Sequence, residues 1–76
     1  MNASTNTTNS VYQLGELNWS ENYYASVRDT IELRCECGTS DAQGIIDAFH
    51  LRDKDAGQWE AWGMTVDLAA ELILTQ

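Results

Sequence analysis

Proline is absent from the sequence, and basic residues, cysteine and histidine are scarce: the 76 residues include four Lys or Arg, two Cys and one His. The absence of proline is compatible with regular secondary structure in every segment. No run of about 18 apolar residues occurs, which excludes a transmembrane helix of ordinary length. The first ten residues have neither the basic start nor the apolar stretch of a secretory signal, so we expect a cytoplasmic protein.

The two cysteines, Cys35 and Cys37, are separated by one residue. On a strand they would point the same way about 6.6 Å apart, whereas a disulfide needs Cβ atoms about 3.5–4.5 Å apart. We therefore expect reduced thiols packed as small apolar side chains. A structural zinc would need His50 and a carboxylate such as Asp47 as further ligands, and the usual pairs are spaced C-x₂₋₄-C. A zinc-stabilised domain is thus the least favoured of the three functional alternatives; the other two, an inhibitor and an interaction module, are described below. We expect no metal and no cofactor.

Acidic residues dominate the charge: twelve Asp or Glu give a formal net charge of −8 and an isoelectric point near 4.1. The hydrophobic fraction of 43% is that of a folded protein rather than a disordered acidic tail. Such a charge attracts cationic surfaces and repels anionic membranes and nucleic acid, so we expect neither of the last two as a direct partner.

Residues 1–10 are uncharged and without periodicity, which predicts a flexible tail before a single small domain at 11–76. From 23 to 37 apolar and polar residues alternate, with Asp29 as the exception. This alternation predicts a half-buried antiparallel strand, bent around Asp29. Its apolar face would comprise Tyr23, Ala25, Val27, Ile31, Leu33, Cys35 and Cys37.

Residues 40–52 are ambiguous. Ser40 and Gln43 resemble a capping box, and a helical stripe would follow at Ala42, Ile45, Ile46 and Phe49. Alternatively, 49–53 and 58–62 form a hairpin around a glycine-bearing turn. We prefer the hairpin, because a helix would leave the strand at Trp59 without a neighbour, although the hairpin places Asp47 on the apolar face.

The last segment, 66–74, predicts a helix with Thr65 as its N-cap and Asp67 in its first turn. Leu68, Ala69, Leu72 and Ile73 would cover the sheet. The predicted fold class is therefore α+β: an antiparallel meander of three or four strands with one C-terminal helix packed on one face.

No catalytic arrangement is evident, so we expect a protein that is not an enzyme. Asp53 and Asp55 lie in a predicted turn, too solvated to act as an acid–base pair. Trp59 and Trp62 would face opposite sides of a strand. An outward Trp62 would suit partner binding, and an indole packed under the following loop is the alternative.

Small size, strong acidity and the absence of an enzymatic motif, taken over the whole chain, resemble the phage-encoded anti-CRISPR proteins and related DNA mimics. The resemblance implies a stoichiometric inhibitor that occupies a basic nucleic-acid-binding groove of a nuclease or CRISPR-type effector complex in the host cytoplasm. It carries no functional residues over to this chain, and Arg34 and Arg52 depart from the most acidic mimics.

Carboxylates repeated along strands would form a lattice of negative charge, densest at 53–60 and on the flank of the C-terminal helix. The residues expected to contact the partner are Glu32, Glu36, Asp53, Asp55, Glu60, Trp62, Asp67 and Glu71. A simpler interpretation is that the charge only keeps the protein soluble. The second functional alternative is an interaction module that dimerises through Trp62 and a strand edge, so we expect a monomer or a weak homodimer.

Overall fold

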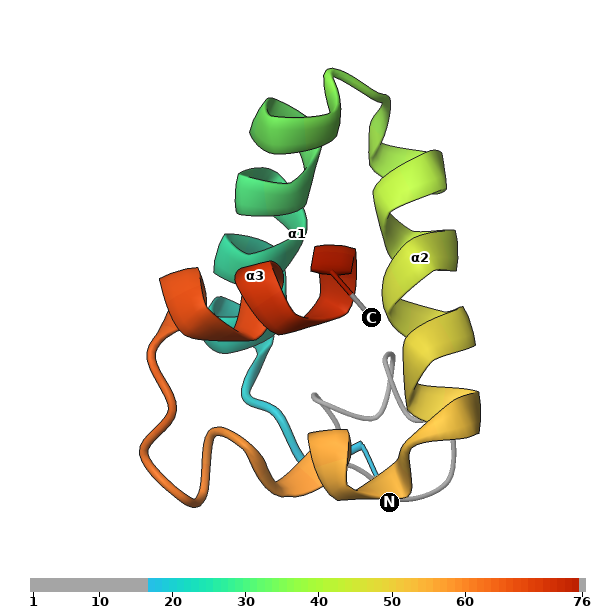
Figure 1. Cartoon of the computed structure of the whole chain (residues 1–76). Helices are drawn as coiled ribbons and strands as arrows, with labels where there is room; N and C mark the ends of the chain where they lie inside the picture. The colour runs from blue at the N-terminus through green and yellow to red at the C-terminus, as the bar shows by residue number, and fades with distance from the viewer. Residues whose placement is uncertain (1–16, 76) are drawn as a thin grey trace, which may run out of the picture.

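The computed structural model describes residues 17–75, and within this range it contains helices and no strand. Helix α1 spans Glu21–Cys35 and α2 spans Thr39–Arg52; the 3₁₀ helix η2 spans Lys54–Gln58 and α3 spans Val66–Thr75. Helices α1 and α2 run in opposite directions side by side, α3 crosses them, and η2 lies below the end of α2 (Figure 1). The predicted tail at 1–10 lies outside the described residues.

The predicted α+β meander is therefore wrong, and the segment read as a bent strand is helix α1. Its buried residues are Tyr23, Tyr24, Val27 and Ile31, which recur at helical spacing. Leu33, assigned to the apolar face of the strand, is 80% exposed. Asp29, the exception to the alternation, lies on the exposed side of the helix.

Local signals begin and end α1. The Ser20 hydroxyl caps its first turn by accepting a hydrogen bond from the Tyr23 N–H at 3.1 Å. At the other end, Glu36 adopts the left-handed conformation, with φ at 55°. The Cys37 N–H then donates to the Glu32 carbonyl at 3.2 Å, as in a Schellman-type helix end. This turn reverses the chain into α2.

The predicted hairpin over 49–62 is also wrong. The alternative, a helix over 40–52, is the correct one, and it corresponds to α2. Its buried residues are Ala42, Ile46, Phe49 and His50. The N-cap is Gly38, without a side-chain hydrogen bond, rather than Ser40. His50, considered above only as a possible zinc ligand, is fully buried. The turn that follows is η2, capped by the Asp53 carboxylate, which accepts from the Asp55 N–H at 3.1 Å.

Helix α3 confirms the prediction for the C-terminal segment, although it packs mainly against α1 rather than against a sheet. The Thr65 hydroxyl accepts a hydrogen bond from the Leu68 N–H at 3.2 Å, as an N-cap does. Ala69, Ala70 and Ile73 form its buried face, whereas Leu68, predicted to lie on the covered face, is 48% exposed. The two alanines are small enough to let α3 lie close to α1. No helix among residues 17–75 has the length and apolarity needed to cross a membrane.

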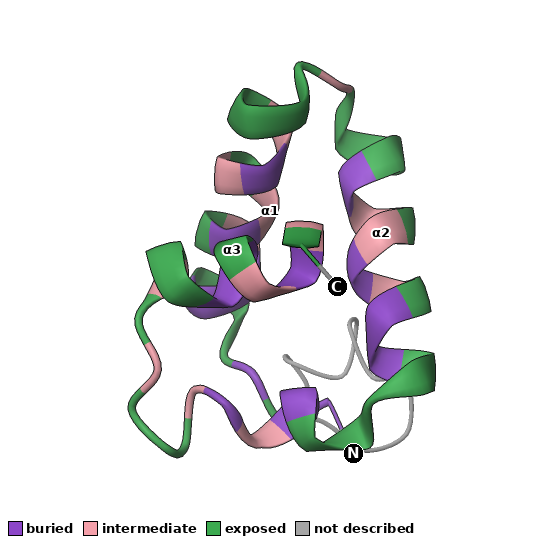
Figure 2. Ribbon diagram, in the orientation of Figure 1, coloured by how far each residue is buried: buried purple, intermediate pink, exposed green. Residues whose placement is uncertain are grey.

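An aromatic cluster joins the elements. Trp19 is 2% exposed, and its indole N–H donates to the Ala56 carbonyl at 2.8 Å. Its ring meets Tyr23 edge to face at 5.0 Å between centroids and stacks near Trp59 at 6.3 Å. The Trp59 ring in turn lies 5.4 Å from that of Phe49. The buried faces of α1, α2 and the segment after α2 therefore converge on one core (Figure 2).

Hydrogen bonds fix the segment 54–64 against the start of α1. Both carboxylate oxygens of Glu60 accept from Ser20, from its N–H at 2.6 Å and its hydroxyl at 2.9 Å. The Tyr23 hydroxyl donates to the Met64 carbonyl at 2.8 Å. Burial, and then the Glu60 charge, raises the pKa of Tyr23, so the phenol stays a donor. These bonds hold Trp59 inward and leave Trp62 outside.

Candidate functional site: an acidic aromatic groove

A groove of about 310 Å³ opens between the end of α2, η2, the turn after η2, and α3. This volume lies at the lower end of the range of about 300–1,000 Å³ that is typical of small-molecule sites. The groove is open to solvent, so it suits one side chain of a partner better than an enclosed metabolite. Its lining residues are Phe49, Asp53, Asp55, Trp59, Trp62 and Leu72.

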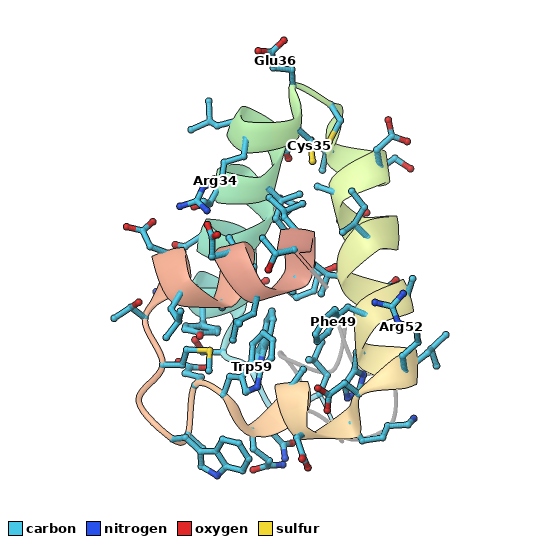
Figure 3. All side chains as sticks on the ribbon, in the orientation of Figure 1. Arg34, Cys35, Glu36, Phe49, Arg52 and Trp59 are labelled. Carbon is cyan, nitrogen blue, oxygen red and sulfur yellow. The ribbon has the colours of Figure 1, made fainter. Side chains whose placement is uncertain are left out.

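The floor of this groove is aromatic. Phe49 and Trp59 are each 5% exposed, and both point into the space bounded by α2, α3 and η2 (Figure 3). The rim carries Trp62, whose side chain is 64% exposed. Of the two alternatives left open for Trp62, the outward one describes the structure, although the backbone there forms a turn and not a strand.

Two carboxylates, Asp53 and Asp55, supply the polar part of the lining, and both side chains are exposed. Neither forms an ion pair with any residue between 17 and 75. Two cations, Arg52 and Lys54, alternate with them in the sequence but do not line the groove. The Arg52 guanidinium lies 5.4 Å from the centre of the Phe49 ring, a cation–π contact.

Only three of the eight predicted contact residues come together here: Asp53, Asp55 and Trp62. Two of the others lie apart and exposed: Glu36 at the far end of α1 (Figure 3) and Asp67 in the first turn of α3. The predicted lattice of carboxylates along strands does not exist in the described range, because no strand is present there.

The remaining three predicted residues take part in interactions within the protein. Glu32 is half-buried and pairs with Arg28 at 3.5 Å. Glu71 pairs with Arg34 at 2.8 Å, which links α3 to α1. Glu60 holds the N-cap of α1, as described above. A partner would compete with these internal bonds, so the three residues are poor candidates for its contacts.

Sequence reasoning missed Phe49 and Leu72 as lining residues. The only sequence signal for Phe49 was its place in the apolar helical stripe of 42–49. Such a stripe indicates a side chain in the core and does not indicate one that lines a groove. Leu72 was expected to cover a sheet, and it reaches the groove because α3 lies across the end of α2.

The cysteines do not form a second site. Cys35 and Cys37 are free thiols, the first exposed and the second half-buried. Burial raises the pKa of the Cys37 thiol, and Cys35, Asp41 and Glu32 raise it further, so the reactive thiolate is disfavoured. His50 is far from both cysteines: it lies eleven residues after Thr39, the first residue of α2, which corresponds to about 16 Å along the helix at 1.5 Å per residue. Within the described chain no cluster of three or more ligand side chains could hold a metal ion.

Comparisons with protein-family models, with curated protein sequences and with solved structures give no significant match.

Proposed function

We propose that this chain is a non-catalytic inhibitor that binds a basic surface of a nuclease or CRISPR-type effector complex and excludes nucleic acid from it. The observation that supports this function is the exposed Trp62 beside two carboxylates that no ion pair neutralises among residues 17–75. Tryptophan is enriched among interface residues that contribute most binding energy. Carboxylates form charge-assisted hydrogen bonds with the Lys and Arg that otherwise hold phosphates.

The distribution of charge favours the same partner. Arg28 and Arg34 are committed to ion pairs within the protein. Several exposed carboxylates form no ion pair in the described part of the chain: Glu21, Glu36, Asp41, Asp53, Asp55 and Asp67. Such a surface accelerates encounter with a basic groove. Because these carboxylates lie on helices and turns, the likeness to DNA is one of charge and not of regular phosphate spacing.

The test is displacement of nucleic acid. Guide-loaded CRISPR effector complexes and DNA-binding nucleases would be saturated with a fluorescent DNA duplex, and anisotropy would be followed as the chain is added. We expect release at a stoichiometry of one, with an apparent affinity that falls steeply between about 50 and 200 mM salt. Failure to release DNA from every complex tested, or direct binding of the chain to free DNA, would contradict the proposal.

Matched variants locate the contact. Asp53→Asn with Asp55→Asn should weaken release more than Glu21→Gln with Asp41→Asn, although each pair removes two charges. Sedimentation addresses the dimer alternative: a stable dimer that buries Trp62 would favour an interaction module over an inhibitor. The strand edge on which that alternative also relied is absent from residues 17–75.

A further inference from the structure

We propose that the groove between α2, η2 and α3 receives one arginine side chain of the protein partner. This inference rests on the proposed function and names the group that the site recognises. The guanidinium is planar, stacks on aromatic rings and presents its donors as a fork, whereas the ammonium of lysine is a compact and strongly hydrated charge.

The aromatic floor provides the first part of the recognition. Phe49 and Trp59 lie 5.4 Å apart between ring centroids and are inclined at 55°, so their faces are directed differently. The protein already places one guanidinium, that of Arg52, 5.4 Å from the Phe49 ring centre. This contact shows that the ring is within reach of a cation at the surface. The apolar stem of an entering arginine would pack on the floor and on Leu72.

The carboxylates provide the second part. Asp53 and Asp55 are two residues apart on a tight 3₁₀ turn. One oxygen of Asp53 accepts the Asp55 N–H at 3.1 Å, which fixes the orientation of that carboxylate before any partner arrives. A carboxylate held in this way loses little conformational entropy on binding. Its other oxygen and the Asp55 carboxylate are acceptors suited to the guanidinium fork.

Trp62 provides the third part, and its backbone is held firmly. The Trp62 N–H donates to the Gln58 carbonyl at 2.9 Å and to the Trp59 carbonyl at 3.1 Å. The Met64 N–H also donates to the Trp59 carbonyl, at 2.9 Å, which closes the turn behind the indole. An exposed indole on a fixed turn can cover a guanidinium that lies on the floor of the groove.

The flanking cations oppose this binding. Arg52 and Lys54 lower the negative potential near the groove, and Arg52 also competes for the Phe49 ring. Replacing Arg52 by glutamine should therefore strengthen the binding of an added arginine, by about twofold given the modest strength of exposed charge pairs. An Arg52→Gln variant that binds more weakly would contradict the assignment.

The experiment uses the peptide N-acetyl-Gly-Arg-Gly-amide, with the lysine and citrulline peptides as controls. Citrulline has the shape of arginine without the charge. The ¹H–¹⁵N spectrum of the full chain reports the indole N–H of each tryptophan. We expect millimolar arginine peptide to shift the signals of Trp59 and Trp62, with lysine weaker and citrulline weakest. Trp19, whose indole N–H is buried and bonded to Ala56, should not move.

Variants complete the test. Asp53→Asn with Asp55→Asn should weaken arginine binding by about three- to tenfold, and asparagine still caps η2, so the turn is retained. Asp67→Asn removes an exposed charge outside the groove and should change little. Equal shifts with citrulline, equal loss in Asp67→Asn, or no shift of Trp59 and Trp62 would each overturn the inference.

The two proposals fail in different ways. If the Asp53→Asn and Asp55→Asn double variant loses the peptide but still displaces DNA from an effector as the wild type does, the groove does not receive an arginine of the partner, and the inhibitor function stands. If the wild-type chain binds the arginine peptide but displaces nucleic acid from no effector, the groove stands and the function is wrong.

Discussion

Two regions of this protein use carboxylates in opposite ways. At the two ends of α1, Glu60 holds Ser20 before the first turn through both carboxylate oxygens, and Glu71 links α3 to Arg34 in the last turn. Around the groove, Asp53 and Asp55 are exposed and form no ion pair with a described residue. The net charge of the chain does not distinguish the two groups. Only the internal bonds separate carboxylates that stabilise the fold from those that stay exposed at the surface.

The tryptophans show the same division. Trp19 is 2% exposed, donates a hydrogen bond and packs against three other aromatic rings. Trp62 is 64% exposed and forms part of the groove rim. Side chains of one residue type therefore serve the fold in one region and stay available in the other, and substitutions in matched pairs test that division.

The largest difference in stability should be found between variants of the two tryptophans, Trp19 and Trp62. Trp19→Ala should cost about 3–5 kcal/mol of unfolding free energy, from lost burial and a cavity. A domain of 76 residues has a total of about 4–11 kcal/mol at typical stability per residue. Trp62→Ala should change stability by less than about 0.5 kcal/mol. Chemical denaturation followed by circular dichroism measures both, and a Trp62→Ala variant that unfolds as readily as Trp19→Ala would remove the distinction.

The carboxylates should give a smaller difference. Glu60→Ala removes two hydrogen bonds to Ser20 and loosens the N-cap of α1, so we expect a loss of about 1–2 kcal/mol. Asp55→Ala should stay within about 0.5 kcal/mol, since the Asp55 side chain carries no interaction identified in the described structure. The same denaturation experiment applies. Equal losses would mean that the groove carboxylates are also structural.

The successes and failures of sequence prediction follow the spacing of the apolar residues. In α1, Tyr23, Val27 and Ile31 are four apart, and a spacing of four satisfies both an alternating strand and a helix. The exposed Leu33 and Cys35 and the buried Tyr24 separate the two patterns, and their exposure is not evident without the structure. In α3 the cap and the helical stripe agree and no alternation competes, so the helix was predicted correctly.

The residues of the candidate site also fall into two groups, those that the sequence predicted and those that only the structure reveals. Asp53 and Asp55 were predicted from the density of carboxylates at 53–60, and Trp62 from its place opposite Trp59 on an expected strand. Phe49 and Leu72 join them only when α2 and α3 meet, which depends on long-range packing that a local pattern does not encode. Glu60 looked like an available charge, and its commitment to Ser20, 40 residues away, is equally invisible in the sequence.

Glu36 is one of the exposed carboxylates, but its backbone conformation is strained and lowers the stability of the fold. Its φ of 55° is unfavourable for a residue with a side chain. Glycine would relieve about 1–2 kcal/mol of left-handed strain against about 0.4–1 kcal/mol of added unfolded-chain entropy. We expect Glu36→Gly to stabilise the protein by about 0.5–1 kcal/mol, measured by thermal unfolding. Glu36→Gln keeps the strain and removes the charge, so it should show little of this gain; an equal gain would assign the effect to charge.

Asp47 falls between the two groups, and it should give the smallest effect. It is half-buried on α2; burial raises its pKa above the ordinary value, and nearby His50 partly opposes this rise. A carboxyl whose pKa is raised by folding favours the folded state when protonated, and this contribution is lost as pH rises through the folded pKa. The ionised carboxylate is therefore unfavourable at neutral pH.

Asp47→Asn should accordingly raise the melting temperature at pH 7, with a difference that shrinks as the pH falls below about 4, where aspartate protonates in the unfolded chain. Asp55→Asn is the control, because it removes the same charge from an exposed position and corrects for relief of general repulsion. Melting curves of the three proteins from acidic to neutral pH measure the effect. A melting temperature for Asp47→Asn below that of the control at pH 7 would show that Asp47 stabilises the fold as an anion, and would place it with Glu60 and Glu71.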